Sequence, residues 1–219
     1  MKTEDLILKS KIIVIVRRVY GEDLVELSKA LYEGGIRLME VTFDQSDPDC
    51  MDKTTEAISM LREYHGDKML FGAGTVLSVD QVDAAYKAGA AYIISPNTNP
   101  DVIRHTRKLG LVSIPGAMTP SEILQAHDCG ANFVKLFPAA TLGLRYAKDI
   151  LAPISHVKLI ATAGITEENI GEFLKLGFAG VGISGRLTEK RLIQEKNWAE
   201  FTERAAAFVR IAQQWQHVA

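Results

Sequence analysis

The sequence lacks the features that mark a disulfide-stapled, zinc-binding or membrane-spanning protein. Its only two cysteines, Cys50 and Cys129, stand far apart without C-x-x-C spacing, which excludes a disulfide framework and a cysteine-rich zinc motif. No apolar stretch approaches the roughly 20 residues that a transmembrane helix needs. The start is too acidic, and Leu6-Ile7-Leu8 too short, for a signal peptide, so a cytoplasmic protein is expected.

The sequence also lacks an excess of charge of either sign. Its 25 Lys and Arg residues against 27 Asp and Glu residues give a formal net charge of -2. Because no basic patch is implied, neither nucleic acid nor an anionic membrane is an expected partner. Hydrophobic residues make up 47% of the 219 residues, enough for a large core.

Strand-like and helix-like segments alternate along the whole chain. The β-branched run at Ile12–Val16 precedes an amphipathic segment at residues 23–31, which stops at Gly34-Gly35. The same order recurs eight times at a spacing of about 25 residues, which predicts a single (β/α)8 barrel over residues 1–219. A short helix over residues 1–11 is expected to lead it. A doubly wound open sheet is the rival fold.

The remaining elements are predicted from periodicity and glycine or proline stops. The other strands are expected at residues 38–43, 69–75, 92–94, 111–114, 133–137, 157–161 and 179–183. The other helices are expected at residues 51–64, 79–88, 101–108, 120–129, 144–151, 167–176 and 198–215.

A single lysine stands inside the apolar run Phe133-Val134-Lys135-Leu136-Phe137. Lysine is rarely buried unless it is paired, and burial lowers its pKa because it disfavours the ammonium. A neutral amine is a nucleophile toward a carbonyl carbon, so Lys135 is a candidate for imine formation. The alternative is a lysine that extends its charge to solvent or pairs structurally with a carboxylate.

Glu40 is a second charged residue within an apolar strand. Alternation along the strands places Glu40 on one face with Thr42, and Lys135 on one face with Phe137. If both faces line the barrel interior, Glu40 could transfer protons while Lys135 forms an imine. A structural ion pair that closes the barrel core is the alternative, and the pattern does not decide between the two.

Polar and glycine-rich segments follow the carboxyl ends of the strands, where barrel enzymes place their active sites. These are Arg17-Arg18, Gly72-Ala73-Gly74-Thr75, Ser95-Pro96-Asn97, Pro115-Gly116, Thr162-Ala163-Gly164 and Ser184-Gly185-Arg186. The last two precede helices, so their backbone N–H groups could bind a phosphate. Glycines that only form turns are the alternative.

Taken together, these segments resemble the 2-keto-3-deoxy-6-phosphogluconate (KDPG) aldolases, a family that overlaps with the 4-hydroxy-2-oxoglutarate (KHG) aldolases. The shared motifs are Gly34-Gly35 before Glu40-Val41-Thr42, Gly72-Ala73-Gly74-Thr75-Val76, Ser95-Pro96, Pro115-Gly116-Ala117-Met118-Thr119-Pro120-Ser121-Glu122 and Val134-Lys135-Leu136-Phe137-Pro138-Ala139. The last two motifs at this spacing are specific to the family, whereas Gly-Ala-Gly-Thr alone is not.

The resemblance implies a class I aldolase, which uses an imine-forming lysine and needs no metal or other cofactor. Its products would be pyruvate and an aldehyde, either glyceraldehyde 3-phosphate or glyoxylate. The resemblance implies Lys135 as the imine-forming lysine and Glu40 as the general acid and base. It also implies Thr75 as a donor to the pyruvate carboxylate, Phe137 as a wall against its methyl group, and Pro96 as a further substrate contact. A small-molecule 2-keto acid substrate and a homotrimer are implied as well.

Three positions depart from the family pattern. Asp44 stands where many members have an arginine for the substrate carboxylate, and members without that arginine have one where Arg17 stands, so Arg17 is the expected clamp. Ala163 replaces a glycine, and Ser184 precedes a glycine instead of following it. The residues expected at the distal phosphate are Thr162, Ala163, Gly164, Ser184, Gly185 and Arg186.

Two other functions stay open on the sequence. A phosphosugar isomerase or epimerase of similar barrel shape would use Lys135 as an electrostatic partner. A catalytically silent barrel would act as a binding protein, and the presence of both Glu40 and Lys135 disfavours it.

Overall fold

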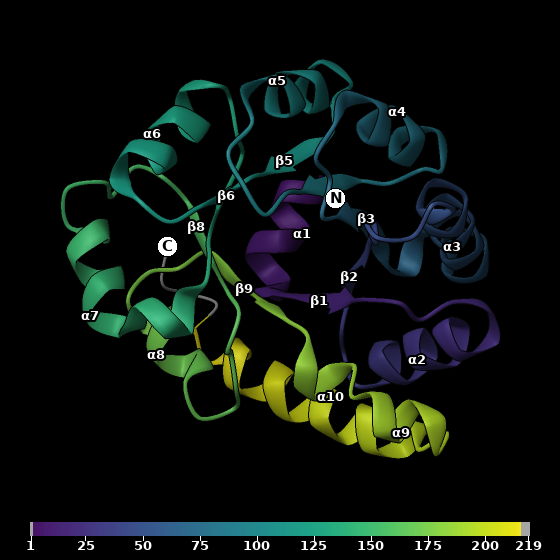
Figure 1. Cartoon of the computed structure of the whole chain (residues 1–219). Helices are drawn as coiled ribbons and strands as arrows, with labels where there is room; N and C mark the ends of the chain where they lie inside the picture. The colour runs from purple at the N-terminus through teal and green to yellow at the C-terminus, as the bar shows by residue number, and fades with distance from the viewer. Residues whose placement is uncertain (1, 216–219) are drawn as a thin grey trace.

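The structure is a computed structural model that describes residues 2–215. A ring of helices surrounds a parallel sheet that curves into a barrel (Figure 1). The strands are β1 (Ile12–Val16), β2 (Leu38–Thr42), β3 (Leu70–Gly74), β4 (Tyr92–Ile94), β5 (Val112–Ile114), β6 (Gly116–Ala117), β7 (Val134–Leu136), β8 (Leu159–Thr162) and β9 (Gly180–Ile183). They pair in the order β5-β4-β3-β2-β1-β9-β8-β7-β6.

The fifth predicted strand, residues 111–114, is present as β5 and ends before Pro115, which has no N–H to give to the sheet. A second short strand that was not predicted, β6, follows Pro115. On one side, the Ser95 N–H donates to the Ile114 carbonyl at 3.3 Å. On the other side, the Lys135 N–H donates to the Pro115 carbonyl at 2.8 Å. The two ends of the strand order are consecutive in the chain, so the nine strands form a nearly closed barrel. The eight predicted units account for the eight strands other than β6, and the doubly wound alternative is wrong.

Helices fill the connections between the strands, and most begin at the predicted start signals. Thr119 forms a capping box with Glu122, and Pro120 occupies the first turn. The helices are α2 (Gly21–Glu33), α3 (Cys50–His65), α4 (Val79–Lys87), α5 (Pro100–Lys108), α6 (Pro120–Asp128), α7 (Ala139–Leu151), α8 (Ile170–Lys175) and α10 (Trp198–Gln213). The sequence therefore predicts the helical layer with small shifts at the ends.

Three helical details differ from the prediction. α7 begins at Ala139, before the predicted start at residue 144. Gly143, whose backbone is not helical (φ 82°), separates this first turn from the rest of the helix. α8 begins three residues late, because the Thr166 N–H donates to the Asn169 side chain in a preceding turn. The 3₁₀ helices η1 (Gly66–Lys68) and η2 (Gly185–Leu187) and the short α9 (Lys190–Gln194) were not predicted. Segments this short show no clear hydrophobic period.

The leading helix, α1 (Thr3–Ser10), closes the amino-terminal end of the barrel. Ile7 is 1% exposed and packs among the side chains that fill the interior, which are Ile13, Leu38, Tyr92, Ile94, Val112, Ile114, Phe133, Ile160 and Ala179. Figure 1 shows α1 lying across the middle of the ring. The predicted helix is present, and its Met1 lies outside the described residues. This arrangement leaves the carboxyl ends of the strands as the open end.

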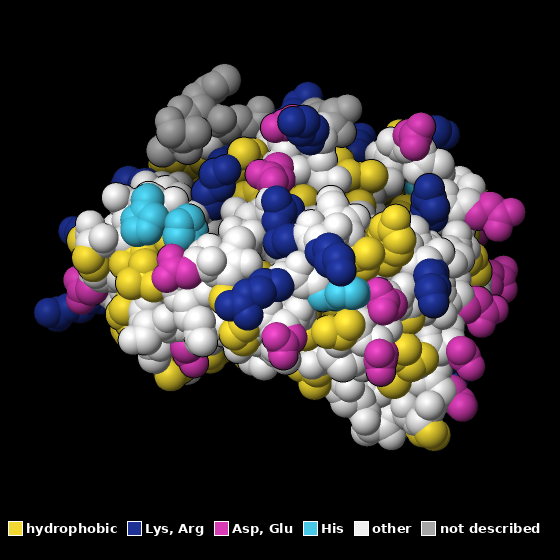
Figure 2. All heavy atoms as spheres, turned by 90° about the horizontal axis from the view of Figure 1, so that it is seen from above, with side chains coloured by type: hydrophobic (Ala, Val, Ile, Leu, Met, Phe, Trp, Pro, Cys, Tyr) yellow, Lys and Arg dark blue, Asp and Glu magenta, His cyan; other side chains and the backbone are white. Residues whose placement is uncertain are grey.

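The surface charges are of both signs, as the small formal net charge of -2 predicts. On the face seen in Figure 2, lysine and arginine side chains are interspersed with acidic and hydrophobic ones. No helix within residues 2–215 is long and apolar enough to cross a membrane.

Candidate functional site

A cavity of about 460 Å³ lies at the carboxyl ends of β1, β7, β8 and β9. The predicted site residues in its lining are Arg17, Lys135, Phe137, Thr162, Ala163, Gly164, Ser184, Gly185 and Arg186. The sequence analysis missed Ile15, Ile165, Thr166 and Gly182, which complete the lining. Alternation along β1 places Ile15 on the Arg17 face, and Thr166 follows the seventh-strand loop directly, so both could have been found.

Lys135 forms part of the cavity wall from the middle of β7 and is only 4% exposed. Its Nζ atom lies 5.0 Å from the centre of the Phe137 ring. Burial lowers the pKa of Lys135, the Arg17 guanidinium lowers it further, and the Glu40 carboxylate opposes both. A larger fraction of this amine is therefore neutral than for a lysine in water.

Glu40 is 1% exposed and projects from β2 into the same interior. Its carboxyl group lies against Gly74, where an added Cβ would stand 2.7 Å from Oε1, so the glycine makes room for it. Burial raises the pKa of Glu40, and the charges of Lys135 and Arg17 act against that rise. The acid and the amine are thus both shifted toward their uncharged forms, as a proton-transfer pair requires.

Arg17 and Thr75 meet at a second cavity, of about 300 Å³, which shares Arg17 with the first. Nη1 of Arg17 donates to Oγ1 of Thr75 at 3.4 Å. Thr75 has a positive φ of 56°, and the Gln45 side chain donates to its carbonyl at 2.8 Å. A guanidinium and a hydroxyl therefore converge at the end of the barrel interior, a combination suited to a carboxylate.

Asp44 does not compete for Arg17, because it pairs with the neighbouring Arg18. Nε of Arg18 lies 2.6 Å from Oδ2 of Asp44. Hydrogen bonds from Arg18 and then from Ser46 lower the pKa of Asp44 to about 2. The negative charge at the position of the family's arginine is therefore neutralised locally.

At the distal end of the first cavity, the Arg186 guanidinium is already paired with the Glu167 carboxylate. Nη2 of Arg186 lies 3.1 Å from Oε1 of Glu167, and Nε donates to the same carboxylate at 3.3 Å. Ala163 has a φ of 78°, in the left-handed region where a Cβ is unfavourable. The Ser184 hydroxyl is 3.3 Å from that of Thr188. This end therefore offers hydroxyl groups and a partly compensated guanidinium.

Comparison with known proteins decides the family. The family model for KDPG and KHG aldolases matches residues 3–204. This chain belongs to the KDPG and KHG aldolase family. Like the relatives described next, it is an aldolase, a lyase.

Two curated aldolases are similar over most of the chain. The 2-dehydro-3-deoxy-phosphogluconate aldolase of Treponema pallidum is 39% identical over 165 residues, which cover 75% of each protein. The 2-dehydro-3-deoxy-6-phosphogalactonate aldolase of Escherichia coli K12 is 30% identical over 203 residues, 92% of this chain and 94% of the relative.

A solved aldolase structure matches the whole barrel. The KDPG aldolase of Legionella pneumophila, captured with pyruvate as a covalent carbinolamine, superposes with a TM-score of 0.83. It is 30% identical, and the match covers 95% of this chain and 98% of that protein.

Two predicted site residues line neither of this aldolase's cavities: Glu40, which is buried in the barrel interior, and Pro96. Pro96 lies after β4, outside both the 460 Å³ and the 300 Å³ cavity. Its carbonyl oxygen instead packs against Gly116, where an added Cβ would lie only 2.3 Å away. The segment after β4 thus packs against β6.

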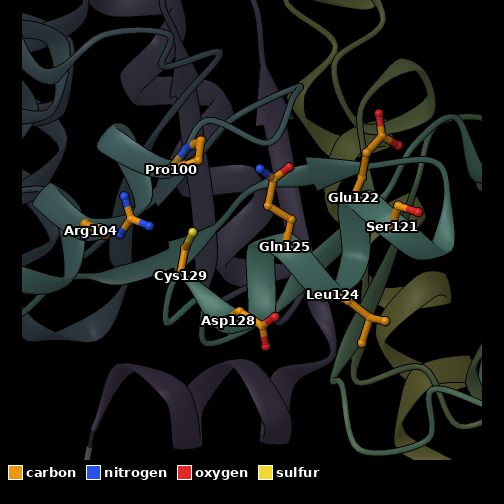
Figure 3. Close-up of a pocket in the computed structure, with 8 residues that line it drawn as sticks. All are labelled: Pro100, Arg104, Ser121, Glu122, Leu124, Gln125, Asp128 and Cys129. Atoms are coloured by element: carbon orange, nitrogen blue, oxygen red, sulfur yellow. The ribbon is translucent and has the colours of Figure 1, made fainter.

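A separate surface cavity between α5 and α6 carries no comparable chemistry (Figure 3). Its lining residues are Pro100, Arg104, Ser121, Glu122, Leu124, Gln125, Asp128 and Cys129. Glu122 accepts hydrogen bonds from the backbone of Met118 and Thr119, so its carboxylate caps α6. Within residues 2–215, no group of three or more His, Cys, Asp or Glu side chains could hold a metal ion.

Proposed function

We propose that this aldolase cleaves KDPG, KHG or both through an imine on Lys135, giving pyruvate and an aldehyde. The observation that carries the proposal is the buried amine of Lys135 in the wall of a substrate-sized cavity, with the buried carboxyl group of Glu40 close enough for each charge to act on the other's pKa. An amine kept partly neutral by burial attacks a ketone, and a nearby acid with a raised pKa exchanges protons at neutral pH.

The proposed reaction begins when the neutral Lys135 amine adds to the C2 carbonyl of the substrate. The carbinolamine loses water to give a protonated imine, which withdraws electrons from the bond between C3 and C4. Glu40 takes the proton of the C4 hydroxyl, the C3–C4 bond breaks, and the aldehyde leaves an enamine on Lys135. Glu40 returns a proton to C3 through water, and hydrolysis of the imine releases pyruvate.

The neighbouring residues supply binding in this proposal. Arg17 and Thr75 hold the substrate carboxylate, and Phe137 lies against the C3 carbon that becomes the pyruvate methyl group. Arg186, Ser184 and the backbone of the 162–164 loop bind the distal group. The Glu167 carboxylate beside Arg186 weakens that binding when the distal group is an anion.

Imine trapping tests the function directly. The protein is incubated with pyruvate and borohydride. Mass spectrometry then measures the mass of the intact protein and locates the modified residue by peptide mapping. We expect one pyruvate-derived adduct on Lys135 and none in Lys135→Ala. Lys11 is an internal control, because it is also 4% exposed but lies beside α1 at the opposite end of the barrel. The absence of an adduct on Lys135 would reject the aldolase proposal.

The same experiment separates the aldolase from a phosphosugar isomerase or a silent binding barrel, neither of which forms an imine with pyruvate. We also propose, from the sequence patterns, that residues 1–219 form one domain and that the protein acts in the cytoplasm. On the family resemblance we propose that it is a homotrimer. Light scattering after size-exclusion chromatography tests the trimer.

A further inference from the structure

Two buried polar atoms in the barrel interior have no hydrogen-bond partner within residues 2–215: Oε2 of Glu40 and the hydroxyl of Tyr92. Both side chains are almost fully buried, at 1% and 0% exposed. Buried polar groups are nearly always satisfied, because leaving one unsatisfied is costly. A phenol donates a hydrogen bond and a carboxylate accepts one, so the two unsatisfied atoms are complementary.

The sheet register brings these two side chains to one level of the barrel. Glu40 on β2 pairs with Gly72 on β3, and Gly72 pairs with Tyr92 on β4. A Cβ added to Gly72 would lie 2.2 Å from the Tyr92 ring and 2.7 Å from its Cζ, the atom that carries the hydroxyl. The ring therefore lies over the glycine, and its polar end crosses β3 toward the strand of Glu40.

The electrostatics agree with this placement. Burial raises the pKa of Tyr92 well above its usual value, and the Glu40 carboxylate raises it further, so the phenol stays protonated and able to donate. The Met39 backbone on β2 also lies close to the hydroxyl and acts in the opposite direction, lowering that pKa. Lys135 from β7 and Arg17 from β1 are the cations that act on Glu40.

We propose that Tyr92 is a positioning residue for Glu40, whose carboxylate it holds toward Lys135 by donating a hydrogen bond, directly or through one buried water. This inference rests on the proposed function, because it assigns Glu40 the role of general base. The hydroxyl fixes one carboxylate oxygen and leaves the other free to face the substrate. It also stabilises the ionised form, which is the form that accepts the substrate proton.

Exchange of the pyruvate methyl protons for deuterium tests this inference, because exchange needs the imine and the base but no aldehyde. The rate is followed by proton NMR across a pH series for the wild type and for Tyr92→Phe. Without the donor, the carboxylate is less stable, so its pKa rises. We expect the acidic limb of the profile to move up by about one pH unit, equivalent to about 1.4 kcal/mol. Borohydride trapping on Lys135 should be unchanged.

Tyr20→Phe is a matched control. The Tyr20 hydroxyl is also buried and without a partner within residues 2–215, but the carboxylates that act on it are those of Asp44 and Asp47. We expect its exchange profile to match the wild type.

Three results would overturn the inference. One is a wild-type exchange profile in Tyr92→Phe, and another is a lower melting temperature in that variant with no movement of the acidic limb. The third is an equal shift in Tyr20→Phe, which would make the effect nonspecific. Failure of the wild type to trap pyruvate would be a separate result, which rejects the proposed function and the role of Tyr92 together.

Discussion

Nη1 of Arg17 donates to Oγ1 of Thr75 at 3.4 Å, which joins the ends of β1 and β3 across β2. The two residues are 58 positions apart in sequence. The adjacent Arg18 turns instead to Asp44, at 2.6 Å. Two consecutive arginines therefore have different partners, and single substitutions can separate their roles.

Arg17→Ala is expected to raise the KM for pyruvate strongly, because it removes the cation that pairs with the substrate carboxylate. Loss of such a charge-assisted pair costs about 2–5 kcal/mol. Steady-state kinetics of aldol condensation with pyruvate measure the change. Arg104→Ala, which removes a guanidinium from the surface cavity between α5 and α6, is the control and should leave the KM unchanged. An unaltered KM in Arg17→Ala would assign the carboxylate to another group.

Glu40→Gln is expected to slow cleavage about 10²–10⁴-fold, the usual contribution of a general base, while pyruvate is still trapped by borohydride. The Glu40 charge raises the pKa of Lys135, so its removal should lower that pKa. The midpoint of the trapping rate against pH should therefore move to lower pH. A midpoint that moves to higher pH would contradict the electrostatic coupling of the pair.

Ala163→Gly is expected to stabilise the protein, because Ala163 has a φ of 78°. Replacing a non-glycine residue in the left-handed region by glycine raises the free energy of unfolding by about 1 kcal/mol, or Tm by roughly 2–4 °C for a chain of this size. Differential scanning calorimetry measures the shift. Ala152→Gly is the control, since Ala152 is exposed and has an ordinary φ of -59°, and this change should lower Tm. A lower Tm for Ala163→Gly would show that the alanine methyl contributes packing that outweighs the strain.

Glu167→Gln is expected to lower the KM for a phosphorylated aldehyde, because it frees Arg186 from its ion pair. A partly exposed pair is worth up to about 1 kcal/mol, which corresponds to roughly fivefold in KM. The KM for glyoxylate should change less. Glu195→Gln is the control, because Glu195 pairs with Arg191 at 3.2 Å away from the residues that line the cavity. Equal effects on both aldehydes would place Arg186 outside the distal site.

The barrel and the pair at its centre were predictable because their signals are local. Lys135 and Glu40 are single charges in apolar strands, and strand alternation fixes the face that each occupies. The (β/α)8 order follows from strand, helix and glycine stops repeated along the chain. Each of these patterns is complete within one segment.

The remaining features depend on relationships between segments. Nothing near Glu167 in the sequence indicates that its carboxylate meets Arg186, and nothing near Pro96 indicates that its carbonyl packs on Gly116. Tyr92 looks like an ordinary apolar strand residue until the register sets it beside Gly72 and in line with Glu40. These contacts are set by strand register and loop packing, which single-sequence patterns do not encode.

Closure of the amino-terminal end of the barrel by α1 affects the order in which substrates bind and products leave. With Ile7 filling the amino-terminal end, a bound molecule enters and departs through the mouth near Arg17 and Arg186. In the proposed reaction the pyruvate fragment stays bonded to Lys135 at the bottom of this passage, with the aldehyde above it. We therefore expect the aldehyde to be released before pyruvate in the cleavage direction and to bind after pyruvate in the synthesis direction.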